Sequence, residues 1–107
     1  MKTYETINGQ EYQISVDYNL GGTNYFTSKT EKRGYYLHIQ PVTREVLDNG
    51  FVSIRMEMFS GAKMLLREVK RKSDKQYALA VKDAELGKID ELFSLMGINR
   101  NESKKAM

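Results

Sequence analysis

The chain has 107 residues and a mass of 12.4 kDa, which limits it to one domain. It has no cysteine and one histidine, so disulfides, Cys-ligated zinc, iron–sulfur clusters and a thiol nucleophile are excluded. Its composition, 40% hydrophobic and 29% charged, is typical of a soluble globular protein. The sequence shows no secretory signal and no apolar run that could cross a membrane, so we predict a cytoplasmic protein without a metal or a cofactor.

The first segment of the chain predicts a β-hairpin. Residues 2–7 can form a strand, and the pair Asn8-Gly9 that follows favours a type I′ turn, because both central positions of that turn need positive φ. Polar residues then alternate with the apolar residues Tyr12, Ile14, Val16 and Tyr18. This alternation predicts a second strand with one apolar face.

The next segment predicts one short and one longer strand. After Gly21-Gly22, residues 24–27 can form a short strand, and residues 28–34 are expected to be a polar loop. Residues 35–42 predict the longer strand, with Tyr35, Leu37 and Ile39 on one face and Tyr36, His38 and Gln40 on the other. Pro41 cannot donate to a ladder, so we expect this strand to bend, to end or to lie at an edge there.

A second clear turn signal, Asp48-Asn49-Gly50, precedes another alternating segment. Its apolar positions are Val52, Ile54, Met56 and Met58. They predict a strand with one buried face. After a turn at Ser60-Gly61, residues 63–71 are expected to form a fifth strand.

A C-terminal helix of about 23 residues is predicted between Ser73 and Gly97. Ser73 is a good N-cap and Gln76 completes a capping box, while Gly97 suits the left-handed residue that ends a helix. The apolar stripe consists of Tyr77, Val81 and Ala84 in the first part, and of Ile89, Leu92, Phe93 and Met96 in the second. The second group is rotated by about 100° from the first, so we expect a bend at Gly87 or contact with more than one surface.

These elements predict an α+β fold in one domain. We expect an antiparallel sheet of about five strands, arranged as hairpins or a meander, with one long C-terminal helix packed on one face. The domain is expected to span residues 1–98, and residues 99–107 are expected to be a flexible polar tail.

The positive charge is concentrated in one segment. Residues 61–82 carry a net charge of +5, whereas residues 1–60 and 83–107 each carry −1. Cations beside aromatic rings suit single-stranded nucleic acid, so we predict a nucleic-acid-binding surface. Its residues are Lys63, Arg67, Lys70, Arg71, Lys72 and Lys75, with Lys29, Lys32, Arg33, Tyr35 and Tyr36. The alternative is that these cations form a solvated face and that the tyrosines pack in the sheet.

A second hypothesis is a protein-binding adaptor or an inhibitor of a host enzyme complex. The helix stripe is wider than a small sheet needs, so Leu86, Ile89, Phe93 and Met96 are candidates for contact with a partner protein or, in a homodimer, with a second copy. Strand-edge pairing is another route to a second copy. No nucleophile or acid–base pair accompanies His38, so we predict no enzymatic activity.

Two stretches, GGTNYFT at residues 21–27 and RGYYLHIQPV at residues 33–42, resemble small accessory proteins of phages and mobile elements of gut bacteria. The resemblance covers about the central third of the chain and transfers no functional residues. It implies nucleic-acid handling or modulation of a host protein. The order of strands followed by a helix is also similar to the fold of single-strand-binding transcriptional coactivators, which is a likeness of layout only.

Overall fold

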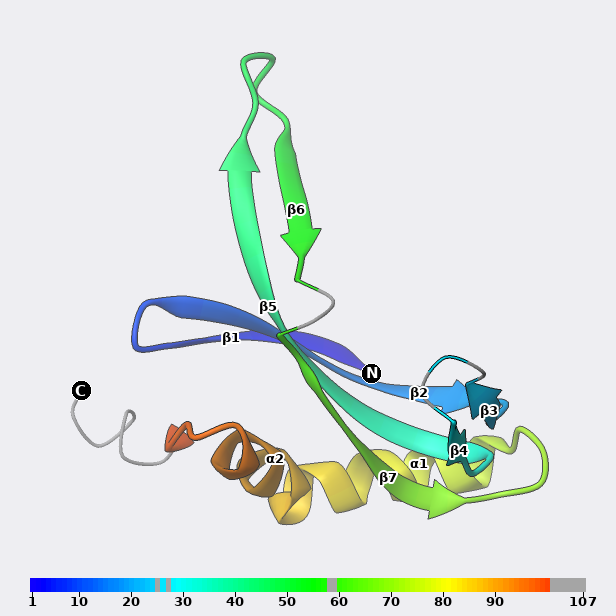
Figure 1. Ribbon diagram of the computed structural model, residues 1–107. Helices are drawn as coiled ribbons and strands as arrows, with labels where there is room; N and C mark the ends of the chain where they lie inside the picture. The colour runs from blue at the N-terminus through cyan, green and yellow to red at the C-terminus, as the bar shows by residue number, and fades with distance from the viewer. Residues whose placement is uncertain (25, 27, 58–59, 101–107) are drawn as a thin grey trace.

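The computed structural model describes residues 1–24, 26, 28–57 and 60–100, and it confirms the predicted α+β class. The main sheet is antiparallel and contains β1 (Lys2–Ile7), β2 (Gln10–Asn19), β5 (Gly34–Val46), β6 (Val52–Met56) and β7 (Ala62–Glu68). A separate small hairpin contains β3 (Gly22–Asn24) and β4 (Lys29–Glu31). The C-terminal helical segment crosses one face of the sheet as α1 (Asp74–Asp83), η1 (Ala84–Lys88) and α2 (Ile89–Leu95) (Figure 1).

The predicted turns are present with the expected backbone. Asn8 and Gly9 have φ of 52° and 83°, as a type I′ turn between β1 and β2 requires. Gly50 has φ of 86° and donates its N–H to Leu47, which closes the turn between β5 and β6. The predicted polar loop at residues 28–34 is partly wrong, because Lys29–Glu31 pair with β3 as strand β4. The short strand predicted at 24–27 is misplaced, because β3 ends at Asn24 and Phe26 lies in a turn; Tyr25 and Thr27 lie outside the described residues.

Strand β5 is central and runs through Pro41 without ending. On one side it pairs with β2 from Gly34 to Val42. On the other side it pairs first with β7, up to Ile39, and then with β6, from Val42 onward. Pro41 lies between these two ladders, where its missing N–H breaks no strand pairing, and its carbonyl accepts the N–H of Glu57 at 3.0 Å.

The core lies between the sheet and the helical segment. The largest fully buried side chains are Phe93, Ile14, Leu37, Ile39 and Val16. They come from α2, β2 and β5, and the ring of Phe93 packs edge-on against Tyr12 with centroids 5.3 Å apart. The alternation predicted for residues 12–18 and 35–39 therefore faces the helix as expected.

A kinked turn at Gly87, closed by a π-type hydrogen bond, brings the two predicted apolar stripes onto the same side. In η1 the N–H of Ile89 donates to Ala84, five residues back, and Gly87 has φ of 149°. A π turn holds one more residue than an α turn, which shifts the phase of everything after it by about 100°. This equals the predicted offset, so Ala80 and Ala84 before the turn and Phe93 after it are buried in one core. The φ of Gly87 lies outside the helical range, so the helical segment is kinked there, which is the bend expected at Gly87 as one of two alternatives.

The helical segment begins and ends as predicted, with one difference at its start. Ser73 accepts the N–H of Gln76 on its side chain at 3.3 Å. The backbone N–H of Ser73 is bound by the hydroxyl of Tyr35 at 2.9 Å, in place of the predicted Gln76 side chain. At the end, Gly97 has φ of 80° and Ile98 donates to Phe93, which forms a Schellman motif.

Candidate protein-interaction arm

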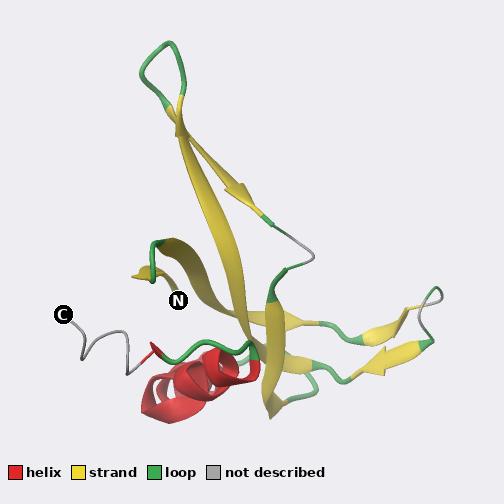
Figure 2. Cartoon of the chain, turned by 60° about the vertical axis from the view of Figure 1, so that its left-hand side comes forward, coloured by secondary structure: helices red, strands yellow, loops and turns green. Residues whose placement is uncertain are grey.

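The upper part of the β5–β6 hairpin stands away from the helix-covered part of the sheet (Figures 1 and 2). We call residues 43–57 the arm. It begins where β2 ends its pairing with β5, at Glu11 opposite Val42. Beyond that point β5 pairs with β6 alone among the described strands, so the arm is a two-stranded ribbon.

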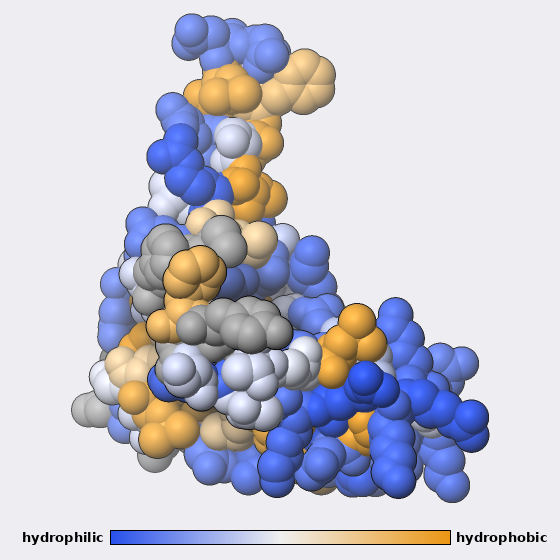
Figure 3. All heavy atoms as spheres, turned by 45° about the vertical axis from the view of Figure 1, so that its right-hand side comes forward, coloured by the Kyte–Doolittle hydropathy of each residue, from blue (hydrophilic) through white to orange (hydrophobic). Residues whose placement is uncertain are grey.

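The arm has one mainly apolar side that is largely open to solvent, with Arg44, opposite Ile54, as its charged member. Directly opposed residues of an antiparallel pair share a face, so Val46 and Val52 lie on the same side as Ile54 and Met56. These side chains are exposed, at 73% for Val46, 55% for Val52, 45% for Ile54 and 43% for Met56. Figure 3 shows apolar side chains gathered along one side of the arm and polar ones along the other. The prediction that this strand has a buried face is therefore wrong for residues 52–56, and Met58 lies outside the described residues.

The tip of the arm adds two more exposed apolar side chains. Leu47 is 42% exposed and Phe51 is 71% exposed, and the N–H of Leu47 donates to the carbonyl of Phe51 at 2.8 Å. Neighbouring apolar side chains that are open to water on a ribbon of two strands are typical of a surface that contacts another molecule.

The base of the arm is fixed to the body by Arg44. Its guanidinium donates to the carboxylate of Glu11 at 2.6 Å and lies 5.0 Å from the ring centroid of Tyr4. The hydrogen bond to Glu11 raises the pKa of Arg44, which remains charged. The arm as a whole carries two arginines and three carboxylates, a net charge of −1. Its charge therefore does not favour nucleic-acid phosphates.

Several of the predicted nucleic-acid-binding cations are engaged within the chain. Lys63 pairs with Glu31, Arg67 pairs with Asp83 at 2.9 Å, and Lys32 pairs with Glu68 at 3.6 Å. Two further cations contact other groups. Arg33 donates to the backbone carbonyls of Leu20 and Lys70, and Lys72 lies 5.7 Å from the ring centroid of Tyr18. Lys29 is exposed on β4.

Three of the predicted cations, Lys70, Arg71 and Lys75, are exposed near the start of α1. They form no ion pair with any residue that the structure describes. The segment is positively charged overall, as predicted, but the cations available to a ligand lie around residues 70–75 and not along all of β7.

The two tyrosines predicted to stack on bases lie inside the protein. Tyr35 is 4% exposed and packs between Tyr18 and Tyr77, with centroids 5.5 and 5.8 Å away. Its hydroxyl binds the backbone of Ser73, as described above. Tyr36 is 6% exposed and donates its hydroxyl to the carbonyl of Lys32. Neither ring offers an open face for a base in this fold, because each fills space in the sheet or at the helix start.

The helix residues predicted to contact a partner are mostly part of the core. Ile89 and Phe93 are buried and Met96 is partly buried, because the π turn points the second stripe at the sheet. Leu86, within the π turn, is the exposed member of that set. Ile89 and Phe93 are therefore not available to a partner. Leu86 and Leu95 are exposed on the helical segment, whereas the arm carries a row of neighbouring exposed apolar side chains.

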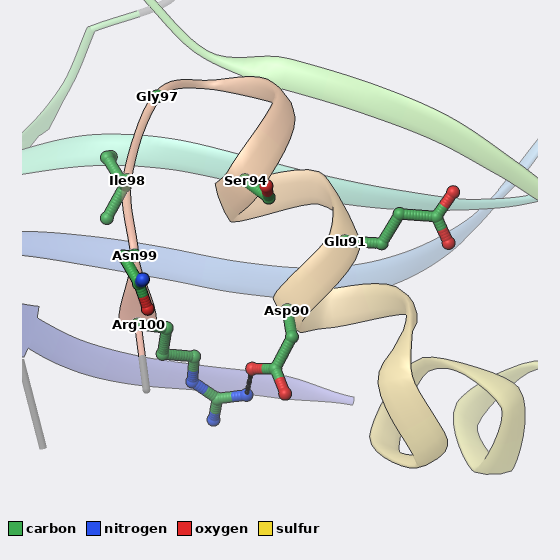
Figure 4. A pocket seen from close by; sticks show the side chains of 7 residues that line it. All are labelled: Asp90, Glu91, Ser94, Gly97, Ile98, Asn99 and Arg100. Carbon is green, nitrogen blue, oxygen red and sulfur yellow. Dashed lines mark hydrogen bonds and ion pairs between the residues drawn. The ribbon is translucent and has the colours of Figure 1, made fainter. Parts of the chain in front are cut away.

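Among the described residues no group of three or more His, Asp and Glu side chains is placed to hold a metal ion. Burial lowers the pKa of His38, and the neighbouring carboxylate of Asp17 partly opposes that shift. Figure 4 shows a hollow beside α2, where Arg100 donates to Asp90 at 2.8 Å. Arg100 also donates to Glu5 at 2.6 Å, so this hollow is bridged by internal ion pairs. Residues 101–107 of the predicted tail lie outside the described residues.

The structure describes no helix with the length and apolar character needed to cross a membrane. Comparisons of the chain with protein-family models, with curated proteins and with solved structures find no significant match. The resemblance to accessory proteins of phages and mobile elements therefore stays a prediction.

The arm is the feature that the sequence did not reveal as a surface. Its alternation was visible, but alternation shows only that two faces differ and does not show what covers the apolar one. The strand that begins at residue 35 is predicted to end at residue 42, whereas β5 continues to Val46, past the end of its pairing with β2.

Proposed function

We propose that this chain is a small non-enzymatic protein-binding module that uses the arm as its contact surface. The observation that carries this proposal is the uncovered apolar side of the arm, formed by Val46, Val52, Ile54 and Met56. Burying such side chains is favourable by about 25 cal/mol per Å² of apolar surface, so a complementary protein surface gains affinity there. A role as an adaptor or as an inhibitor of a larger host enzyme complex fits a chain of this size.

The test compares the two sides of the same strand. Val52 and Ile54 are replaced together by serine in one variant, and Arg55, on the opposite side of the ribbon, is replaced by alanine in the control. We expect the tagged parent and Arg55→Ala to capture the same protein from nuclease-treated host lysate, and the Val52→Ser/Ile54→Ser variant to lose it. Capture that is equal for all three chains, or no reproducible capture by the parent, would contradict the proposal. Circular dichroism checks that each variant is folded.

A second candidate function is nucleic-acid association through residues 70–75. It is favoured by the exposed cations Lys70, Arg71 and Lys75, which have no ion-pair partner among the described residues. Lys72, between them in sequence, is exposed above Tyr18 and adds to the local positive charge. This arrangement supports phosphate contact without base readout, because the nearby tyrosines Tyr35 and Tyr36 are buried.

Titration with single- and double-stranded oligonucleotides at 50 and 200 mM salt tests this second candidate. For about three phosphate contacts, the affinity is expected to fall between these salt concentrations by about 40-fold for duplex DNA and by about 20-fold for single strands. The Lys70→Ala/Arg71→Ala/Lys72→Ala variant is expected to abolish binding, whereas Lys82→Ala, on the exposed side of α1, serves as the control. Absence of binding at 50 mM salt, or binding that the triple variant retains, rules out this function.

A further inference from the structure

The outer edge of β6 carries unpaired backbone groups in a regular row. The N–H of Leu47 donates to Phe51 and the N–H of Glu57 donates to Pro41, which fixes the hydrogen-bonded pairs of the β5–β6 ladder. Hydrogen-bonded and non-hydrogen-bonded pairs alternate along an antiparallel ladder. Val52, Ile54 and Met56 therefore belong to the non-hydrogen-bonded pairs, and their N–H and C=O groups point away from β5.

This edge lacks two of the features that usually prevent strand addition, a proline and a bulge. In the described part of the chain β6 pairs with β5 alone, and it contains no proline and no bulge. Its one charged residue, Arg55, lies on the polar side of the ribbon. The same residues that offer free backbone groups, Val52, Ile54 and Met56, also bear the exposed apolar side chains. The edge therefore suits an extended strand that has apolar residues at alternate positions.

We propose that the strand added at this edge is β6 of a second copy of the chain, which pairs antiparallel about a two-fold axis at Ile54. This inference rests on the proposed function of the arm as a contact surface and names one partner for it. The sequence of β6, Val-Ser-Ile-Arg-Met, has apolar residues at alternate positions. A second copy of β6 is therefore an extended strand of the kind that suits this edge.

The register centred on Ile54 is self-complementary. It pairs the whole of β6 with its symmetry mate, with Ile54 opposite Ile54 and Val52 opposite Met56. Both of these pairs are apolar on the uncovered side and can exchange their free backbone hydrogen bonds across the axis. On the polar side Arg55 lies opposite Ser53, so no like charges are directly opposed. A register centred on Arg55 would oppose two arginines, which is unfavourable.

The other edge of the arm is less suitable for a second copy. There the free backbone groups belong to Arg44 and Val46 of β5, and the side chain of Arg44 is already held by Glu11 and Tyr4. That edge is also shorter, because β2 occupies β5 up to Val42. A closed two-fold dimer through β6 covers the open edge of β6 in each copy and leaves nothing for further addition at that edge.

The test exploits the position of residue 54 on the axis. By light scattering across a dilution series, the parent is expected to approach twice 12.4 kDa at high concentration. Ile54→Lys and Ile54→Glu, each alone, are expected to remain at 12.4 kDa, because like charges then meet at the axis. An equimolar mixture of the two is expected to regain the doubled mass. Leu95→Lys, at a position 72% exposed on α2, is the control and keeps the mass of the parent.

A second measurement uses the absence of cysteine from the chain. A single Ile54→Cys variant is expected to form a covalent dimer with a short thiol-reactive cross-linker, whereas a Lys82→Cys variant does not. A parent that stays at 12.4 kDa, a charge-swapped mixture that stays monomeric, or equal cross-linking of both variants overturns the dimer.

If the parent is monomeric while Val52→Ser/Ile54→Ser still loses a captured protein, the dimer fails and the proposed function stands. If the dimer forms but no other protein is captured, the dimer stands and the adaptor or inhibitor role fails.

Discussion

Replacing Phe93 by alanine is expected to lower the free energy of unfolding by about 3–5 kcal/mol. The ring is fully buried and packs edge-on against Tyr12, at the place where α2 meets the sheet. Its removal loses apolar burial and leaves a cavity that the rigid sheet cannot close. A domain of this size has about 5–15 kcal/mol of stability, so the variant is expected to be close to unfolding at 37 °C. Urea denaturation followed by far-ultraviolet circular dichroism measures the change.

Leu95→Ala is the matched control for this prediction. Leu95 lies two residues away on the same helix but is 72% exposed, so its truncation is expected to change the stability by less than about 0.5 kcal/mol. Equal losses for the two variants would show that the second helical stripe does not face the sheet. That result would also contradict the alignment that the π turn produces.

Replacing Gly34 by alanine is expected to lower the free energy of unfolding by about 3 kcal/mol, although the change adds a single methyl group. A Cβ atom at this position would overlap the backbone carbonyl oxygen of Arg67 and lie 2.9 Å from the Cα of Glu68. Both obstacles are backbone atoms of the neighbouring strand, so no side-chain rotation relieves them. The first rungs of the β5–β7 ladder, at Gly34–Glu68 and Tyr35–Arg67, must then separate.

The comparison for Gly34 is Gly22→Ala. Gly22 has φ of 124° and open space around its Cβ position, so alanine there is strained by the backbone alone. We expect a smaller loss, of about 1–2 kcal/mol. The two variants separate crowding from backbone strain by the same denaturation measurement. If Gly34→Ala is as stable as the parent, then β5 and β7 do not approach each other as described.

The sequence predicted the parts of this fold that depend on interactions between residues close together in the chain. Asn8-Gly9 and Gly50 specify their turns because few residues tolerate positive φ. Ser73 and Gly97 specify the helix ends through hydrogen bonds within a few residues. The strand and helix order followed from hydrophobic periodicity, and the class of fold followed from that order.

The surfaces were harder to predict, because they depend on contacts between distant residues. Lys63 and Arg67 looked available to phosphate, but their partners Glu31 and Asp83 come from other elements of the fold. Tyr35 looked like a stacking residue, but its hydroxyl is needed where the chain enters α1. The apolar side of β6 looked like core, because a single strand does not show which face of the sheet the helix covers. Met56 lies opposite Val42, and Val42 is on the other face of β5 from Ile39, which faces the helix.

The continuity of β5 has a consequence for how binding and stability are linked. This strand of 13 residues contributes its first part to the core and its last part to the arm, with no hinge between them. A molecule that binds the arm in its paired form cannot bind it when β5 is unfolded. A partner bound to the arm therefore stabilises the whole domain, by a free energy that grows with the logarithm of the partner concentration relative to its Kd. The melting temperature of the domain rises accordingly. Thermal stability can report on a partner that never touches the hydrophobic core.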